Sequence, residues 1–123
     1  MMNLKGGILL NNLMLVGRIA QDIEVKTSPT GKEVTTISVA VNRSFKNMDG
    51  TYDTDFIDCV LWDGLAKNIH EYCHKGDIIG IRGRLQTNTY EKDDVKHKVL
   101  EVVAERLSFI SSKRAIIEKA ADE

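Results

Sequence analysis

The sequence is poor in proline, in cysteine and in long apolar runs, and each shortage excludes a class of protein. Two cysteines, Cys59 and Cys73, do not build the disulfide framework of a small secreted domain and fit a reduced chain. No apolar run approaches the roughly 20 residues of a membrane-spanning helix. No charged segment leads into the apolar stretch and cleavage site of a secretory signal. We therefore expect a cytoplasmic protein.

Excess charge of either sign is also lacking. Seventeen Lys and Arg residues stand against 18 Asp and Glu, which gives a formal net charge of −1. Affinity for nucleic acid therefore cannot rest on bulk charge and needs local placement of basic residues together with stacking. The 123 residues predict a single domain with a modest core.

Residues 55–62, Asp-Phe-Ile-Asp-Cys-Val-Leu-Trp, form the most informative segment. Successive side chains of a strand point to opposite sides. One face therefore carries Ile57, Cys59 and Leu61, an apolar row suited to a core, and the other carries Phe56, Asp58, Val60 and Trp62. Because Asp58 lies between the aromatic residues Phe56 and Trp62, an open face that meets a flat ligand is favoured over a second buried face. The alternative is that both rings cover a second layer, and this segment alone does not separate the two.

Four further strands are expected at residues 12–19, 34–43, 77–90 and 97–108. In the first, Gly17 breaks the inward row, at a position where a strand kinks or another backbone approaches closely. In the strand at residues 34–43, the inward row is Ile37, Val39 and Val41. In the strand at residues 77–90, the core row is Ile79, Ile81, Gly83 and Leu85, and the opposite row is Arg82, Arg84, Gln86, Asn88 and Tyr90. In the strand at residues 97–108, the apolar row is Leu100, Val102 and Ala104.

A short helix is expected between the third and fourth strands. Its helical spacing comes from Leu65, Ile69, Tyr72 and Cys73. Asp63 is the expected N-cap, through its carboxylate, and Gly76 the expected left-handed C-cap.

The order of three strands, one helix and two strands argues against a parallel α/β sheet. It predicts an all-β fold, a five-stranded Greek-key barrel of the OB-fold type with one short helix between strands 3 and 4. An SH3-like barrel and a sandwich are the alternatives, and the helix after the third strand favours the OB-fold. We expect this domain at residues 11–110. Residues 1–10 are expected to be a disordered extension, and residues 111–123 a short C-terminal segment with a helical pattern.

Four segments resemble those of the bacterial single-stranded DNA-binding protein family. They are residues 12–19 (Asn-Leu-Met-Leu-Val-Gly-Arg-Ile), 40–45 (Ala-Val-Asn-Arg-Ser-Phe), 55–62, and 75–87, which opens with Lys-Gly-Asp and closes with Gly-Arg-Leu-Gln-Thr. The match covers about residues 11–109, in the right order and spacing. The resemblance implies a homotetramer of OB-folds that binds single-stranded DNA without sequence choice. It also implies work in replication, recombination and repair at the bacterial nucleoid.

The resemblance further implies which residues contact DNA. The stacking aromatics of the family fall on Phe45, Phe56, Trp62 and Tyr90. Stacking tolerates any sequence, because every base has a π-face. Basic residues beside the rings are expected to contact phosphates and to make binding sensitive to salt. These are Arg43, Lys46, Lys75, Arg82 and Arg84.

Three positions within the domain depart from the family pattern. Asp58 lies on the aromatic face, where a neutral or basic residue would suit DNA better. Asn88 and Thr89 replace residues that are often basic in the family. We expect these changes to weaken the electrostatic part of binding without abolishing it.

The two ends of the chain also depart from the family. The chain ends at Ala121-Asp122-Glu123, without the long flexible tail and acidic tip that recruit replication and repair enzymes, so we do not expect those partners. The expectation is a short form, as on a phage or mobile element, or a chain whose tail was removed. At the other end, residues 10–13 (Leu-Asn-Asn-Leu) resemble the family's start at Met-Asn-Asn-Leu. We expect translation to begin at Leu10, from a TTG codon.

Enzymatic alternatives have weaker support. Asp53, Asp55 and Asp58 are the residue types of a metal-dependent nuclease, but they recur in no motif. His70, Cys73 and His74 lack a fourth ligand and the spacing of a zinc site. We predict no catalysis, no metal and no cofactor. Two non-enzymatic alternatives stay open: a dimeric OB-fold protein of the primosomal type, and an interaction module that only co-assembles with full-length subunits.

Overall fold

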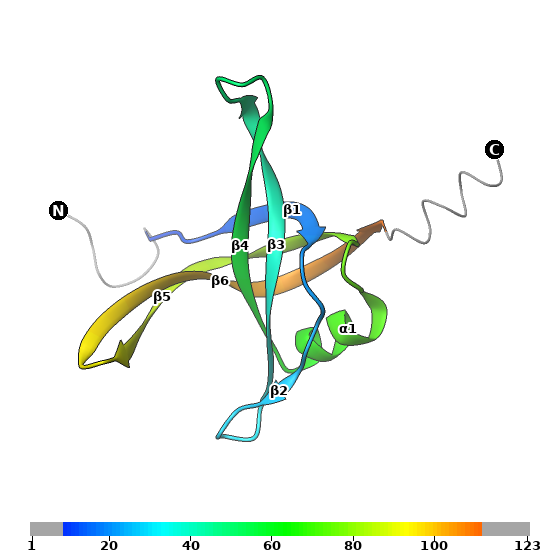
Figure 1. The fold of residues 1–123 in the computed structure, drawn as a ribbon. Coiled ribbons are helices and arrows are strands. Elements are labelled where there is room, and N and C mark those ends of the chain that lie inside the picture. Colours follow the sequence, from blue (N-terminus) through cyan, green and yellow to red (C-terminus); the bar gives the residue numbers. More distant parts are fainter. Residues whose placement is uncertain (1–8, 112–123) are drawn as a thin grey trace.

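The computed structural model describes residues 9–111 of the chain. Its elements are β1 (Leu13–Ile19), β2 (Lys26–Thr27), β3 (Glu33–Lys46), β4 (Tyr52–Trp62), α1 (Gly64–Tyr72), β5 (Ile78–Lys92) and β6 (Val95–Ser111). Figure 1 shows two long hairpins, β3–β4 and β5–β6, which project in different directions from a shared centre. The expectations for residues 1–8 and 112–123 lie outside the described residues. Within residues 9–111, no helix has the length and apolar character needed to cross a membrane.

The strands close into a barrel. Their order is β1-β5-β6-β4-β3-β2, and β1 pairs in addition with β3 at Arg18↔Ala40 and Ile19↔Val39. Five long strands therefore form a ring, while β2 only adds to the start of β3. Every pairing is antiparallel except that of β4 with β6. The predicted OB-fold with a helix before the fourth long strand is confirmed, and only the two-residue β2 was not predicted, because it is too short to show alternation.

The core follows the predicted inward rows. Ile37, Cys59, Leu61 and Ile81 are fully buried, and α1 adds Ala66 and Ile69 to the same cluster. Full burial of one such aliphatic side chain contributes about 1.5–3 kcal/mol to folding. Alternating apolar residues on separate strands thus supply the main stabilisation of the barrel.

Two residues assigned to the core rows are exposed, and these assignments were wrong. Leu85 is 43% exposed and Leu100 is 61% exposed. Beyond Thr87↔Leu100 the β5–β6 hairpin continues as a two-stranded arm to Lys92↔Val95, outside the barrel (Figure 1). Leu100 lies at the base of this arm, and Leu85 lies past Gly83, the last residue of β5 that pairs with β1.

A bulge in β6 also shifts the alternation of that strand. Arg82 pairs with Arg106 but Gly83 pairs with Ala104, so Glu105 is an extra residue. A bulge of this kind reverses which side the following residues face. Leu107, not residue 106, therefore continues the side of β6 that packs against the core.

The predicted ends of the helix are partly wrong. Asp63 precedes α1, but its side chain makes no capping hydrogen bond, and its φ of 49° departs from the extended conformation of a capping residue. Gly76 does take the left-handed conformation, with φ 97°, but it lies beyond the C-cap residue Cys73. The Gly76 N–H donates to the carbonyl oxygen of Ile19 at 2.8 Å, so this turn is tied to β1.

The predicted close approach at Gly17 is confirmed. A Cβ atom at this position would lie 2.5 Å from the carbonyl oxygen of Ala40 and 2.7 Å from Cγ1 of Val39. Both neighbours belong to β3, at the point where β1 closes the barrel. The absence of a side chain is therefore a condition of closure.

We predict that Gly17→Ala lowers the free energy of unfolding by about 1–3 kcal/mol, because the added methyl group displaces β3. Gly80→Ala is the matched control, since its Cβ would meet its nearest atom at 3.4 Å, an ordinary contact. Urea denaturation of both variants at equal protein concentration measures the difference. Equal stability of Gly17→Ala and the unchanged protein would contradict the closure argument.

Candidate nucleic-acid interface

One face of the sheet continues from β4 across β6 to β5. Residues directly opposite each other in paired strands project to the same side. Val60, on the same side of β4 as Trp62, pairs with Val103 of β6, and Val103 pairs with Arg84 of β5. Trp62 and Arg84 therefore belong to one surface, although they come from different hairpins.

We call this surface the outer face. It carries Phe56, Asp58, Val60 and Trp62 of β4, His97, Val99, Glu101 and Val103 of β6, and Arg82, Arg84, Gln86, Asn88 and Tyr90 of β5. Val60 and Val103 are only 6% and 8% exposed, so the two hairpins meet over a buried apolar contact. Polar and aromatic side chains surround that contact on the strands at either side.

All four predicted stacking residues are exposed. Phe56 and Trp62 are 65% and 40% exposed on the outer face, and Tyr90 is exposed farther along β5. Phe45 is the most exposed of the four and lies near the tip of the β3–β4 hairpin. The exposure of Phe56 and Trp62 fits the open face and not a covered second layer.

Tyr90 has an aromatic neighbour that the sequence did not predict. The rings of Tyr90 and His97 lie with their centroids 5.0 Å apart and an interplanar angle of 21°, in a stacked arrangement. The two residues are direct cross-strand partners in the β5–β6 arm. A lone histidine in a charged stretch gives no sign of this contact until the register of the hairpin is known.

The predicted phosphate contacts are in different surroundings. Arg82 and Arg84 lie on the outer face, and the Arg84 guanidinium donates to Oε1 of Gln86 at 2.7 Å. Lys46 is exposed on the β3–β4 hairpin, with its Nζ 5.9 Å from the ring centroid of Tyr52. Lys75 lies in the turn after α1 and lines a hollow with Ile23, His70, Cys73 and His74, so it is not part of the outer face.

Two carboxylates oppose the basic character of the outer face. Asp58 is exposed on β4, as its position in the sequence predicted. Glu101 of β6 accepts a hydrogen bond from the side-chain amide of Asn88. The electrostatic potential that a phosphate would meet is therefore uneven across this surface.

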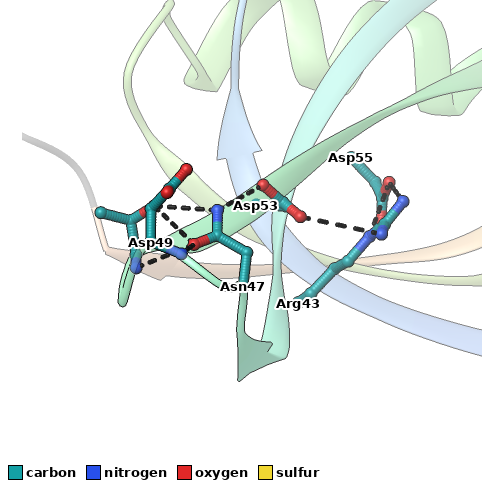
Figure 2. Close-up of polar contacts among 6 residues, drawn as sticks. Arg43, Asn47, Asp49, Asp53 and Asp55 are labelled. Atoms are coloured by element: carbon teal, nitrogen blue, oxygen red, sulfur yellow. Dashed lines mark hydrogen bonds and ion pairs between the residues drawn. The ribbon is translucent and has the colours of Figure 1, made fainter.

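Arg43 is bound to a carboxylate of its own hairpin (Figure 2). Its Nε donates to Oδ2 of Asp55 at 3.1 Å, and its Nη2 donates to Oδ1 at 3.0 Å. This two-pronged hydrogen bond holds the pKa of the Asp55 carboxyl below its usual range and raises the pKa of Arg43. The pair is thus fully ionised at neutral pH.

Neither cysteine is placed for nucleophilic chemistry. Burial raises the pKa of the Cys59 thiol to about 12 and that of Cys73 to about 11, so both are protonated at neutral pH. Within residues 9–111, no group of three or more His, Cys, Asp or Glu side chains is arranged to hold a metal ion.

Comparison with known proteins gives consistent matches. The model of the Single-strand binding protein family matches residues 10–110. The chain is 42% identical to Single-stranded DNA-binding protein 3 of Streptococcus agalactiae over 87% of its own length and 78% of the relative's. It is 41% identical to Single-stranded DNA-binding protein B of Bacillus subtilis, over 93% and 100% of the two chains. It is 43% identical to Single-stranded DNA-binding protein 3 of Listeria innocua, over 86% and 67%.

We predict that Arg43→Gln raises the pKa of the Asp55 carboxyl toward its usual value of about 3.9. A depressed carboxyl pKa stabilises the fold above the unfolded-state pKa, and this contribution disappears as the pH falls through the folded-state value. An NMR titration of the Asp55 side-chain carboxyl carbon measures the shift, with Lys46→Gln as a control that leaves it unchanged. An Asp55 pKa that is the same with and without Arg43 would contradict the pairing.

Proposed function

Because this chain belongs to the single-strand binding protein family, we propose that it binds single-stranded DNA without sequence preference. The observation that carries the proposal is the outer face, on which Phe56, Trp62 and Tyr90 are exposed across two hairpins. A surface of exposed rings suits a strand whose bases are unpaired, because duplex DNA keeps its bases stacked inside the helix.

Stacking supplies most of the affinity in this proposal. One base stacked on an aromatic ring contributes about 1–3 kcal/mol, and the contribution varies little with the base. Trp62 offers the largest ring, and Phe56 lies on the same side of the same strand. A strand that contacts Trp62, Phe56 and Tyr90 in turn would cross the junction between β4 and β6.

The affinity for single-stranded DNA also has a salt-dependent contribution, from phosphate contacts made by Lys46, Lys75, Arg82 and Arg84. Each neutralised phosphate of a single strand changes the slope of log K against log salt by about 0.7. The formal net charge of −1 and the two carboxylates of the outer face predict a modest total slope. Arg43 is also a predicted phosphate contact, but its guanidinium is already bound by the carboxylate of Asp55.

We also propose that the protein has no catalytic activity and that it protects single strands during replication, recombination and repair. Its site of action would be the bacterial cytoplasm and nucleoid, where single-stranded DNA arises. Binding by exposed rings needs no bond-making step and no cofactor. Single-stranded oligonucleotide that is degraded in magnesium or manganese by the pure protein would contradict the proposal.

Assembly of copies through β1 is part of the proposed function. On one side β1 pairs with β5 from Leu13 to Arg18, but on the other it pairs with β3 only at Arg18 and Ile19. The first part of β1 thus keeps an open edge, and Met14 and Val16 are exposed there. An open edge without charged side chains is a template for pairing with another chain.

We predict a homotetramer, because symmetric pairing of two such edges and of the resulting dimers leaves no edge open. Light scattering at micromolar concentration should give a mass close to four chains of 13.8 kDa. Met14→Lys places a charge on the edge and should shift the protein toward smaller species. A stable monomer of the unchanged protein would contradict the assembly.

We predict that Trp62→Ala weakens binding to poly-dT about ten- to hundredfold, because one stacking platform is lost. Tyr72→Ala is the matched control, since Tyr72 is an exposed aromatic of α1 that lies off the outer face. Fluorescence of Trp62 should fall when single-stranded DNA is added and change little with duplex. A folded Trp62→Ala variant with unchanged affinity would contradict stacking at this position.

A further inference from the structure

The β3–β4 hairpin loses its regular backbone pairing next to Phe45. Asn42 pairs with Thr54 and Lys46 pairs with Tyr52, so residues 43–45 face the single residue Asp53. The ladder of backbone hydrogen bonds therefore has a gap immediately below the tip of the hairpin. Phe45 lies inside this gap, and backbone pairing alone does not fix its position.

Side chains bridge the gap in place of the backbone (Figure 2). Arg43 is bound by both oxygens of Asp55, and its Nη1 lies 3.9 Å from Oδ2 of Asp53. The other oxygen of Asp53 accepts a hydrogen bond from Nδ2 of Asn47 at 3.0 Å. A continuous row of polar contacts thus joins β4, the irregular stretch of β3 and the turn at the tip.

Asn47 extends this row into the turn itself. Its Oδ1 accepts hydrogen bonds from the backbone N–H groups of Asp49 at 2.9 Å and Thr51 at 3.1 Å. The conformation of the tip is therefore connected through Asp53 to the guanidinium of Arg43. Loss of Arg43 would leave Asp53 and Asp55 as two neighbouring carboxylates that repel each other.

The same arrangement makes Arg43 a poor partner for phosphate. Two carboxylates surround one guanidinium, so the cluster as a whole carries negative charge at neutral pH. A phosphate that took the place of Asp55 would approach Asp53 as well. Lys46 differs, because no carboxylate of residues 9–111 lies within ion-pair distance of its Nζ.

We propose that Arg43 is a positioning residue for DNA binding: with Asp55 and Asp53 it holds the β3–β4 hairpin in the shape that presents Phe45, and it does not contact phosphate. This inference rests on the proposed function and replaces the phosphate contact that the family resemblance implies for Arg43. An ion pair this exposed contributes little to overall stability, so variants of Arg43 fold. The affinity gain comes from a preorganised hairpin, which has less motion to lose on binding.

The first test is the salt dependence of binding to oligo(dT), which separates a phosphate contact from a positioning role. Lys46→Gln, the matched control on the same hairpin, should make the slope of log K against log salt about 0.7 less steep. Arg43→Gln should weaken binding about three- to tenfold at every salt concentration and leave the slope unchanged. Arg43→Lys should lose the same affinity, because an ammonium keeps the charge but lacks the two-pronged geometry.

The second test is a double-mutant cycle with Phe45. Phe45→Ala should weaken binding about tenfold or more through the loss of one stacked base. If Arg43 acts through Phe45, Arg43→Gln should cost less than about twofold in the Phe45→Ala background. A residue that only supports the general fold would show the same cost in both backgrounds.

Three results would overturn the inference while the proposed function stands. The first is a slope of log K against log salt that becomes about 0.7 less steep in Arg43→Gln. The second is full affinity in Arg43→Lys. The third is independent effects of Arg43→Gln and Phe45→Ala on the affinity. Failure of the unchanged protein to bind oligo(dT) is a different result, because it would overturn the proposed function and the inference together.

Discussion

A short parallel pairing between β4 and β6 joins the two halves of this molecule. It consists of Cys59↔Val102 and Val60↔Val103. On one side of the sheet, Cys59 and Val102 lie in the core that both hairpins share. On the other side, Val60 and Val103 form the buried contact that makes the outer face continuous. Without this pairing, Phe56 and Trp62 would belong to a different surface from Arg84 and Tyr90.

The sequence predicted the faces of individual strands well, because alternation is a property of one strand and needs no partner. Ile37, Cys59 and Ile81 are buried as predicted. The prediction failed where the answer depends on a neighbouring strand. Leu85 and Leu100 follow the alternation of the core rows, but Leu85 lies past the end of the pairing with β1 and Leu100 lies at the base of the two-stranded β5–β6 arm.

In the candidate site, too, the features of single strands were predictable and the contacts between strands were not. The exposed aromatics were predictable from alternation and from the family resemblance, whereas their neighbours were not. The stacking of His97 on Tyr90 requires the register of the β5–β6 arm. The binding of Arg43 by Asp55 requires the register of β3 with β4, which the sequence around either residue does not reveal. Charge at a sequence position therefore does not reveal whether a cation is available to DNA.

We propose that one strand of DNA crosses from β4 to β5 over the outer face. Photocrosslinking with an oligo(dT) that carries 5-iodouracil, followed by mass spectrometry of the peptides, tests it most directly. We expect adducts on Phe56 or Trp62 of β4 and on Tyr90 of β5 with the same oligonucleotide. Adducts confined to one hairpin, or concentrated on Tyr72 of α1, would contradict a continuous binding face.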